Sequence, residues 1–306
     1  MRTISVIITT YNDGEYLKRS IPSVLGQSLK PTEIIVVDDG SEDETAKIIV
    51  NKFNESVEVP IIFIKKGNGG PSSSRNVGIK IATGEFVAFL DADDELTSDS
   101  IKLRYDIMDG LDLDYASVYC TAIHDFDGKS QFLQNVFETD GAIDGSLVGR
   151  KIGIPGGPPY HLFRRKALNE VDGYNESLKF SEDFELILRL SKKWKFKGVN
   201  KVGFVRHIRK NSWSKSDPYL AYFGVEKFLE IATSNKLLSS DEILQRKKDN
   251  KLTLVKRLVG QRKSWAEISK YIDDAFKLKL PKNIKESSLF ILNIIWKLNP
   301  FREKLK

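Results

Sequence analysis

The chain has 306 residues, of which 41% are hydrophobic and 29% are charged, the balance of a folded globular protein rather than of a disordered one. Its longest apolar stretches fall short of the ~20 residues that a helix needs to cross a bilayer, and we see no signal peptide. One cysteine, Cys120, excludes an internal disulfide, and with three scattered histidines it excludes a structural zinc site. We therefore expect a cytoplasmic protein.

The first part of the chain alternates strand and helix patterns. Apolar runs predict strands at 4–9, 34–37, 61–64 and 86–90, and helical patterns lie between them; the third of these helices spans 73–81. Strands separated by helices form right-handed crossovers, so we expect a mainly parallel sheet in an α/β fold.

The pattern is looser in the middle of the chain and becomes entirely helical after residue 217. We expect three parts: a nucleotide-binding half at 1–110, an acceptor-binding half at 111–217 and a helical extension at 218–306. The expected elements of the last two parts are short strands at 115–120 and 131–137, a helix at 183–192, two strands flanking 197–200, and helices at 222–233, 241–258, 265–276 and 285–298.

Carboxylates gather directly after the strand at 86–90. Asp91, Asp93 and Asp94 lie within four positions, and their negative charges repel one another unless a cation lies among them. Hard divalent cations prefer such oxygen ligands. The alternative is an acidic turn that caps the next helix, a role we expect for Asp94.

Two other strand ends favour a binding site. Thr10 and Tyr11 follow the first strand, and Asp39 follows the second. The carboxyl ends of parallel strands meet at one edge of a sheet, where ligands of open α/β sheets bind. A nucleoside diphosphate suits this combination, because Tyr11 can pack on a base, Asp39 can accept from a base N–H, and the acids can hold a cation on the phosphates. Arg75 can contact phosphate or form a structural salt bridge.

Two other nucleotide-binding motifs are excluded. The turn after the first strand, 10–14, carries side chains where a dinucleotide-binding Rossmann domain requires glycines. The chain also contains no P-loop motif.

Four motifs resemble the family 2 glycosyltransferases of the GT-A fold, in the same order and spacing. They are SVIITTYN at 5–12, EIIVVDDGS at 33–41, GPSSSRN at 70–76 and FLDADD at 89–94. The resemblance covers roughly 3–215. It implies a GT-A-type, mainly parallel sheet flanked by helices, with a Rossmann-like nucleotide-binding half and an acceptor half.

The resemblance also implies a cofactor and donor contacts. Asp93 would be the principal ligand of Mn²⁺ or Mg²⁺, and Asp91 would contact both metal and ribose. His207 resembles a late histidine of the family that approaches the metal or the diphosphate, although a lone histidine is more often structural. Arg209 and Lys210 would assist the leaving diphosphate. The other implied donor contacts are Thr10, Tyr11, Asp39 and Arg75.

The segment 173–185 resembles the family element that supplies the catalytic base, which here would be Asp183. A helix N-terminus keeps a carboxylate ionised and orients it, as a base that deprotonates an acceptor hydroxyl requires. The alternative is that Ser181, Glu182 and Asp183 merely cap the helix. Gly156 and its neighbours up to Pro159 are expected to shape the acceptor floor.

The end of the chain is basic. From 244 to 306 there are 17 Lys and Arg against 6 Asp and Glu. The apolar segment 288–298, with Trp296 followed by Arg302, Lys304 and Lys306, either docks as a core helix or lies at a membrane interface. No nucleic-acid-binding module accompanies the charge, so we expect no nucleic-acid partner.

Together these features predict an inverting, metal-dependent glycosyltransferase that uses a nucleotide sugar, namely a UDP-sugar. Its acceptor would be a hydroxyl of a glycan or a lipid-linked glycan in cell-surface polysaccharide synthesis, at the inner face of the membrane. Two alternatives stay open: a catalytically silent sugar-nucleotide-binding or scaffolding protein, and a nucleotidyltransferase on a related fold. The latter lacks support because its N-terminal glycine-rich loop is missing.

Overall fold

The computed structural model describes residues 3–126, 128, 130–149, 153–209, 217–281 and 283–298. The chain divides into two compact units, 1–209 and 210–306, each of which is considered by itself. The predicted division into 1–110, 111–217 and 218–306 stays a prediction.

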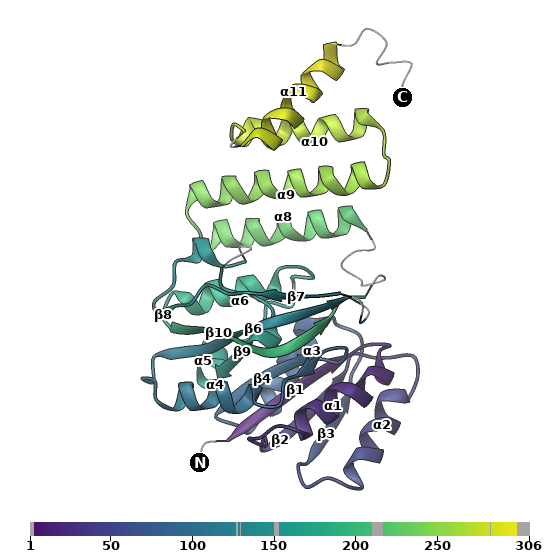
Figure 1. The fold of residues 1–306 in the computed structure, drawn as a ribbon, viewed down its shortest axis with the longest axis vertical. Helices are drawn as coiled ribbons and strands as arrows, with labels where there is room; N and C mark the ends of the chain where they lie inside the picture. The colour runs from purple at the N-terminus through teal and green to yellow at the C-terminus, as the bar shows by residue number, and fades with distance from the viewer. Residues whose placement is uncertain are drawn as a thin grey trace. The chain divides into compact units, whose positions relative to one another are not determined.

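The first unit is built on a ten-stranded sheet (Figure 1). Its order is β3-β2-β1-β4-β9-β6-β10-β5, with β7 paired to β6 and β8 paired to β10. The strands are β1 (Ile4–Thr10), β2 (Glu33–Asp38), β3 (Ile61–Lys65), β4 (Phe86–Asp91), β5 (Glu95–Leu96), β6 (Tyr115–Phe126), β7 (Ser130–Gln134), β8 (Asp140–Gly141), β9 (His161–Arg164) and β10 (Lys195–His207).

Strand direction places the ends of the longer strands at one edge. β1 pairs in parallel with β2 and β4, and β2 with β3. β9 runs antiparallel to both β4 and β6, and β6 pairs in parallel with β10. The carboxyl ends of β6 and β10 therefore lie at the same edge as that of β4. The predicted α/β fold with a mainly parallel sheet is confirmed.

Helices flank this sheet. The predicted helix at 73–81 begins at Pro71, because proline is well suited to the first helical position and the preceding Gly70 adopts a φ of +88°. The helices of this unit are α1 (Leu17–Leu25), α2 (Thr45–Asn54), α3 (Pro71–Ile81), α4 (Ser100–Asp109), α5 (Arg165–Glu170) and α6 (Glu182–Ser191), with short 3₁₀ turns at Gly14–Tyr16, Gly145–Leu147 and Pro158–Tyr160.

The central strands are covered on both faces. Every residue of β2 is buried, and so are all but one residue each of β1 and β4. This is why these strands appear in the sequence as continuous apolar runs instead of alternating patterns. Their rigid backbones hold the residues at their carboxyl ends in place.

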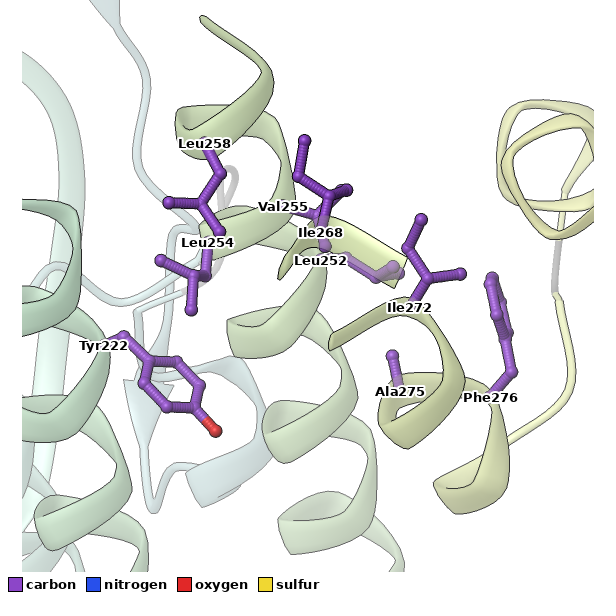
Figure 2. Packing of buried hydrophobic residues seen from close by; sticks show 9 residues of the cluster. All are labelled: Tyr222, Leu252, Leu254, Val255, Leu258, Ile268, Ile272, Ala275 and Phe276. Atoms are coloured by element: carbon purple, nitrogen blue, oxygen red, sulfur yellow. The ribbon is translucent and has the colours of Figure 1, made fainter. Parts of the chain in front are cut away.

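The second unit is a stack of helices in which α8, α9 and α10 lie side by side (Figure 1). Its core joins residues of these helices such as Leu254, Ile268 and Phe276 (Figure 2). Within the described residues, we find no helix with the length and hydropathy needed to cross a membrane. The helices are α8 (Pro218–Ser234), α9 (Ser240–Gly260), α10 (Trp265–Leu278) and α11 (Ile284–Leu298).

The last helix has two apolar sides. Phe290 packs against Phe276, with ring centroids 4.9 Å apart. Ile291 and Leu292 are 54% and 55% exposed. One side of α11 thus docks on the helical core while another leaves apolar side chains uncovered. The side chain of Trp296, and Arg302, Lys304 and Lys306, lie outside the described residues.

Candidate active site

The carboxyl ends of β1, β2 and β4 lie side by side. Thr10 pairs with Asp38, and Thr9 pairs with Asp91. The N–H of Asp39 donates to the carbonyl of Thr10 at 2.9 Å. The structure therefore brings together the strand ends at which the sequence predicted a site.

Three predicted nucleoside contacts lie on the β1–β2 side of this edge. Tyr11 is 46% exposed, whereas Thr10 is buried. The carboxylate of Asp39 accepts from the N–H of Gly70 at 2.7 Å and from Lys66 Nζ at 2.7 Å. Asp39 thus fixes the glycine turn at 67–70, which leads into α3. A base N–H would share the carboxylate oxygens of Asp39 with the N–H groups of that turn.

The carboxylates of the acidic turn after β4, residues 91–94, have different partners. Asp94 is buried, and its Oδ1 accepts from the backbone N–H of His207 at 2.9 Å. Burial, followed by the charges of Asp91 and Asp93, raises the pKa of Asp94 well above its ordinary value. The residue that precedes α4 as its N-cap is Asp99. The predicted capping role of Asp94 is therefore wrong, because its carboxylate ties the turn to β10 instead.

Asp93 lies beside a guanidinium group. Burial, followed by the charge of Asp91, raises the pKa of Asp93. Arg209 Nη2 lies 2.7 Å from Asp93 Oδ2. The same guanidinium donates two hydrogen bonds to Asp13, each 2.8 Å long. Asp13 had no predicted role, and Lys210 lies outside the described residues.

His207 is held between two carboxylates. Its Nδ1 lies 3.1 Å from Asp125 Oδ2, and its Nε2 lies 2.9 Å from Glu95 Oε1. A bond to a metal would need one of these nitrogens to be released. The metal-binding role of His207 stays a prediction.

The donor chemistry of the acidic turn fits a hard divalent cation. In the described part of the chain, no group of three or more His, Cys, Asp or Glu forms a ready-made metal site. Mg²⁺ is usually held by one or two carboxylates together with substrate phosphates, not by an all-protein cage. Asp91 and Asp93 can supply those carboxylates, because their side chains are 38% and 20% exposed.

The predicted base lies at the start of α6. Asp183 is the second residue of this helix, and its Oδ1 accepts from the N–H of Phe184 at 2.8 Å. Burial, and then the charge of Glu182, raises the pKa of Asp183 to about 7. Ser181, which precedes the helix, has a φ of +59° and forms no side-chain cap hydrogen bond. A group that is half ionised near neutral pH can take up a proton during a reaction.

Arg75 connects the acidic turn to α6. Its guanidinium lies 3.0 Å from Glu182 Oε1 and 3.3 Å from Asp91 Oδ1. It also lies over the ring of Tyr174, 5.4 Å from the centroid. Arg75 is only 6% exposed, so this charge is held in a fixed position. The sequence contains no signal for the pair with Glu182, because 107 positions separate the two residues.

The loop before β9 packs directly on the predicted base. A Cβ at Gly156 would collide with the ring of Phe184 and lie 3.1 Å from Asp183 Cγ. The buried ring of His161 contacts this loop, with its Nε2 2.7 Å from the carbonyl of Pro155. A glycine is therefore required where this loop forms one wall beside Asp183.

A cavity of about 550 Å³ lies at the other end of β4. Its basic residues already have partners, since Arg164 pairs with Glu85 at 3.3 Å and Arg165 Nε donates to the carbonyl of Gly84 at 2.6 Å. None of the predicted site residues lines this cavity.

Two relatives illustrate the comparison with known sequences. Chondroitin synthase of Escherichia coli is 29% identical over 216 residues, which are 70% of this chain and 30% of that protein. GalNAc(5)-diNAcBac-PP-undecaprenol β-1,3-glucosyltransferase of Campylobacter jejuni is 28% identical over 291 residues, 93% of this chain and 85% of that protein. The chain spans less than a third of the length of the first curated relatives it matches.

Solved structures share the fold. Staphylococcus aureus TarS 1–349 in complex with UDP-GlcNAc superposes with a TM-score of 0.62 at 22% identity, covering 91% of this chain and 82% of that one. The mannosyltransferase PcManGT of Pyrobaculum calidifontis, in complex with GDP-Man and Mn²⁺, gives a TM-score of 0.62 at 13% identity, covering 99% and 82%.

The family model described as "Glycosyl transferase family 2" matches residues 5–172, which are more than half of the chain. The match includes the strand ends that carry Thr10, Asp39 and Asp91, together with Arg75. The chain belongs to glycosyltransferase family 2.

Proposed function

We propose that the protein is a metal-dependent, inverting glycosyltransferase that moves a sugar from a UDP-sugar to a hydroxyl of a glycan or lipid-linked acceptor. The observation that carries this proposal is the link through Arg75. This residue joins Asp91 at the acidic turn to Glu182, the neighbour of Asp183. The buried guanidinium of Arg75 thus connects the expected donor side of the site to the helix that carries the expected base.

The nucleotide would bind at the edge formed by β1, β2 and β4. Tyr11 offers an exposed ring to the base, and Asp39 offers acceptor oxygens. Thr10 and Arg75 complete the set of donor contacts. The complexes of TarS with UDP-GlcNAc and of PcManGT with GDP-Man support a nucleotide-sugar donor.

Asp93 and Asp91 would hold Mn²⁺ or Mg²⁺, with His207 as a further contact. When bound, such a cation acts as a Lewis acid that neutralises negative charge on the departing diphosphate. The complex of PcManGT with Mn²⁺ supports a divalent cation in this fold.

Asp183 would take the proton from the acceptor hydroxyl. The hydroxyl oxygen then bonds to the anomeric carbon from the face opposite the nucleotide, while the bond from that carbon to the diphosphate oxygen breaks. The products are the inverted glycoside and the nucleoside diphosphate, and the proton stays on Asp183. The pKa of about 7 suits this role, because the carboxylate is available near neutral pH and still accepts a proton.

The acceptor and the membrane contact rest on two observations. The Campylobacter relative is named for a substrate on undecaprenol diphosphate and matches most of this chain. The second unit combines a basic excess with the exposed apolar residues Ile291, Leu292 and Ile294 of α11. Apolar side chains with neighbouring positive charge suit an anionic lipid surface at the inner face of the membrane.

The experiment measures UDP release from a panel of UDP-sugars with Mn²⁺, with and without a lipid-linked glycan acceptor. Asp93→Ala should abolish turnover together with metal-dependent UDP binding. Asp183→Asn should keep UDP binding and lower turnover by about 10²–10⁴-fold, the usual contribution of a general base. Asp106→Asn, which changes an exposed carboxylate on α4, is the matched control and should behave like the unaltered protein.

The outcomes separate the alternatives. Binding of UDP-sugars without release of UDP under any metal would support a silent binding protein. Release of pyrophosphate from a nucleoside triphosphate and a sugar phosphate would support nucleotidyl transfer. Either result would overturn the proposed reaction.

A further inference from the structure

A guanidinium group contacts the carboxylate that the proposed reaction assigns to a metal ion. Arg209 Nη2 lies 2.7 Å from Asp93 Oδ2, the carboxylate expected to be the principal metal ligand. A metal bound to this oxygen and a guanidinium in contact with it would place two positive groups on one atom. Metal binding through this oxygen therefore competes with Arg209.

Arg209 also contacts a second carboxylate, that of Asp13, and this contact would remain after Arg209 leaves Asp93. Its Nη1 and Nη2 donate to the two oxygens of Asp13 at 2.8 Å each, which is the bidentate geometry of a strong arginine–carboxylate pair. The guanidinium also lies over the ring of Tyr16, 4.8 Å from its centroid. These contacts allow Arg209 to leave Asp93 by rotating about Asp13.

A second arginine contacts the acidic turn through other atoms. Arg19 also reaches the acidic turn, but it donates to the backbone carbonyl of Asp93 and pairs with Glu95 at 3.2 Å. Arg19 can keep both contacts when a metal binds the Asp93 carboxylate. Arg209, in contrast, competes with a metal for the Asp93 carboxylate.

We propose that Arg209 is an internal counter-ion that occupies the cation position at Asp93 until a metal–nucleoside diphosphate complex displaces it. The proposal rests on the proposed function, because it takes Asp93 as the metal ligand. A metal alone must compete with the guanidinium without compensation. A metal that arrives with a diphosphate brings anionic oxygens that Arg209 can contact after it leaves Asp93. The contact thus favours binding of metal and nucleotide together.

The test measures binding of Mn²⁺ by isothermal titration calorimetry, first alone and then with saturating UDP. Arg209→Gln should bind Mn²⁺ alone about fivefold more tightly than the unaltered protein, the size expected from losing one partly exposed ion pair. In the presence of UDP the order should reverse, because Arg209→Gln lacks the guanidinium that would contact the diphosphate. Arg209→Lys keeps the charge and should show an intermediate affinity.

Two controls make the result specific. Arg19→Gln removes a neighbouring charge without touching the Asp93 carboxylate, and its effect on Mn²⁺ affinity should be clearly smaller than that of Arg209→Gln. Arg246→Gln removes an arginine paired with Glu242 in the second unit and should leave Mn²⁺ affinity unchanged. Circular dichroism and thermal melting establish that each variant is folded.

The outcomes distinguish this inference from the proposed function. Equal Mn²⁺ affinity of Arg209→Gln and the unaltered protein would overturn the proposed counter-ion role of Arg209, even if UDP-sugar turnover is normal. Equal effects of Arg19→Gln and Arg209→Gln also overturn it, because they indicate a general effect of charge. Tighter Mn²⁺ binding by Arg209→Gln without any turnover of UDP-sugars supports the counter-ion and contradicts the proposed reaction.

Discussion

Asp183 owes its acid–base behaviour to its immediate surroundings. Burial raises its pKa first, and the adjacent charge of Glu182 raises it further. Arg75 acts in the opposite direction, and it is held 3.0 Å from Glu182. At the residue scale, the site therefore depends on a few charges within one buried network.

The pH dependence of turnover should report this network. We expect UDP-sugar turnover to rise with pH through about 7, as Asp183 becomes ionised. Glu182→Gln removes a neighbouring negative charge and should lower the pKa of Asp183. The rise in turnover should then occur at lower pH. The measurement is the pH profile of kcat/KM, and an unchanged limb would show that Glu182 does not act on the base.

The same pKa has a consequence for stability. The folded-state pKa of about 7 lies above the ordinary value of 3.8. The contribution of Asp183 to the free energy of unfolding is therefore fully present below pH 3.8 and is lost as pH rises through 7. Asp183→Asn removes this loss. The variant should therefore gain more thermal stability relative to the unaltered protein at pH 8 than at pH 5, as melting curves at the two pH values would show.

Gly156 is expected to be intolerant of substitution. A methyl group there would collide with the ring of Phe184 and press on Asp183. Gly156→Ala should lower kcat by about 100-fold, the scale of effect that follows a displacement of about 1 Å in a reacting group. Gly110→Ala is the control, since a Cβ there lies 3.7 Å from its nearest neighbour. Equal activity of both variants would contradict the close packing.

At the scale of elements, a buried lysine fastens α11 to α9. The side chain of Lys248 is fully buried, and its Nζ lies 2.7 Å from Glu286 Oε2 and 2.6 Å from the carbonyl of Leu280. The ammonium also lies 5.1 Å from the ring centroid of Phe276. A buried ion pair is costly to break from one side, because the remaining charge loses its partner.

Glu286→Gln should therefore destabilise the protein by about 3 kcal/mol, the lower end of the range for a broken buried pair. Lys248→Met removes the charge and keeps an apolar chain of similar length, so it should cost less. Asp274→Asn breaks the exposed pair with Lys277 and should change the free energy of unfolding by less than ~1 kcal/mol. Urea unfolding measures all three, and an equal cost for Glu286→Gln and Asp274→Asn would refute the role of the buried pair.

β10 shows how packing changes an element. The sequence predicts two strands flanking 197–200, whereas the structure has one strand over Lys195–His207. Gly198 lies within it, with the ring of Tyr119 occupying the space of a Cβ. The pairing with β6 shifts register between Gly198 and Val202. A glycine that suggests a turn in the sequence here allows an aromatic ring to pack against a continuous strand.

At the scale of the whole molecule, the end of the chain carries a basic excess, with 17 Lys and Arg against 6 Asp and Glu over 244–306. We expect the chain to sediment with vesicles that contain anionic phospholipid and not with neutral vesicles. Replacing Ile291 and Leu292 with serine should weaken this binding, because both are more than half exposed on α11. Replacing the exposed Leu113 of the first unit is the control. Equal binding of all variants, or equal binding to neutral vesicles, would contradict the membrane contact.

The sequence alone was enough to predict the alternating strands and helices of the first hundred residues, the mainly parallel sheet and the family. Those features depend on patterns among residues close together in the chain, such as the apolar run that ends at Asp91. The same local patterns predicted that Thr10, Asp39 and Asp91 would share one edge, because parallel strands place their ends together.

Which charges meet within the site depends on contacts between distant segments of the folded chain. Arg75 and Glu182 are 107 positions apart, and Arg209 and Asp13 are 196 positions apart. Their contacts depend on the insertion of β9 between β4 and β6 and on the path of β10, which no local pattern specifies. Burial, which raises the pKa of Asp183, likewise arises only when distant segments pack around the start of α6.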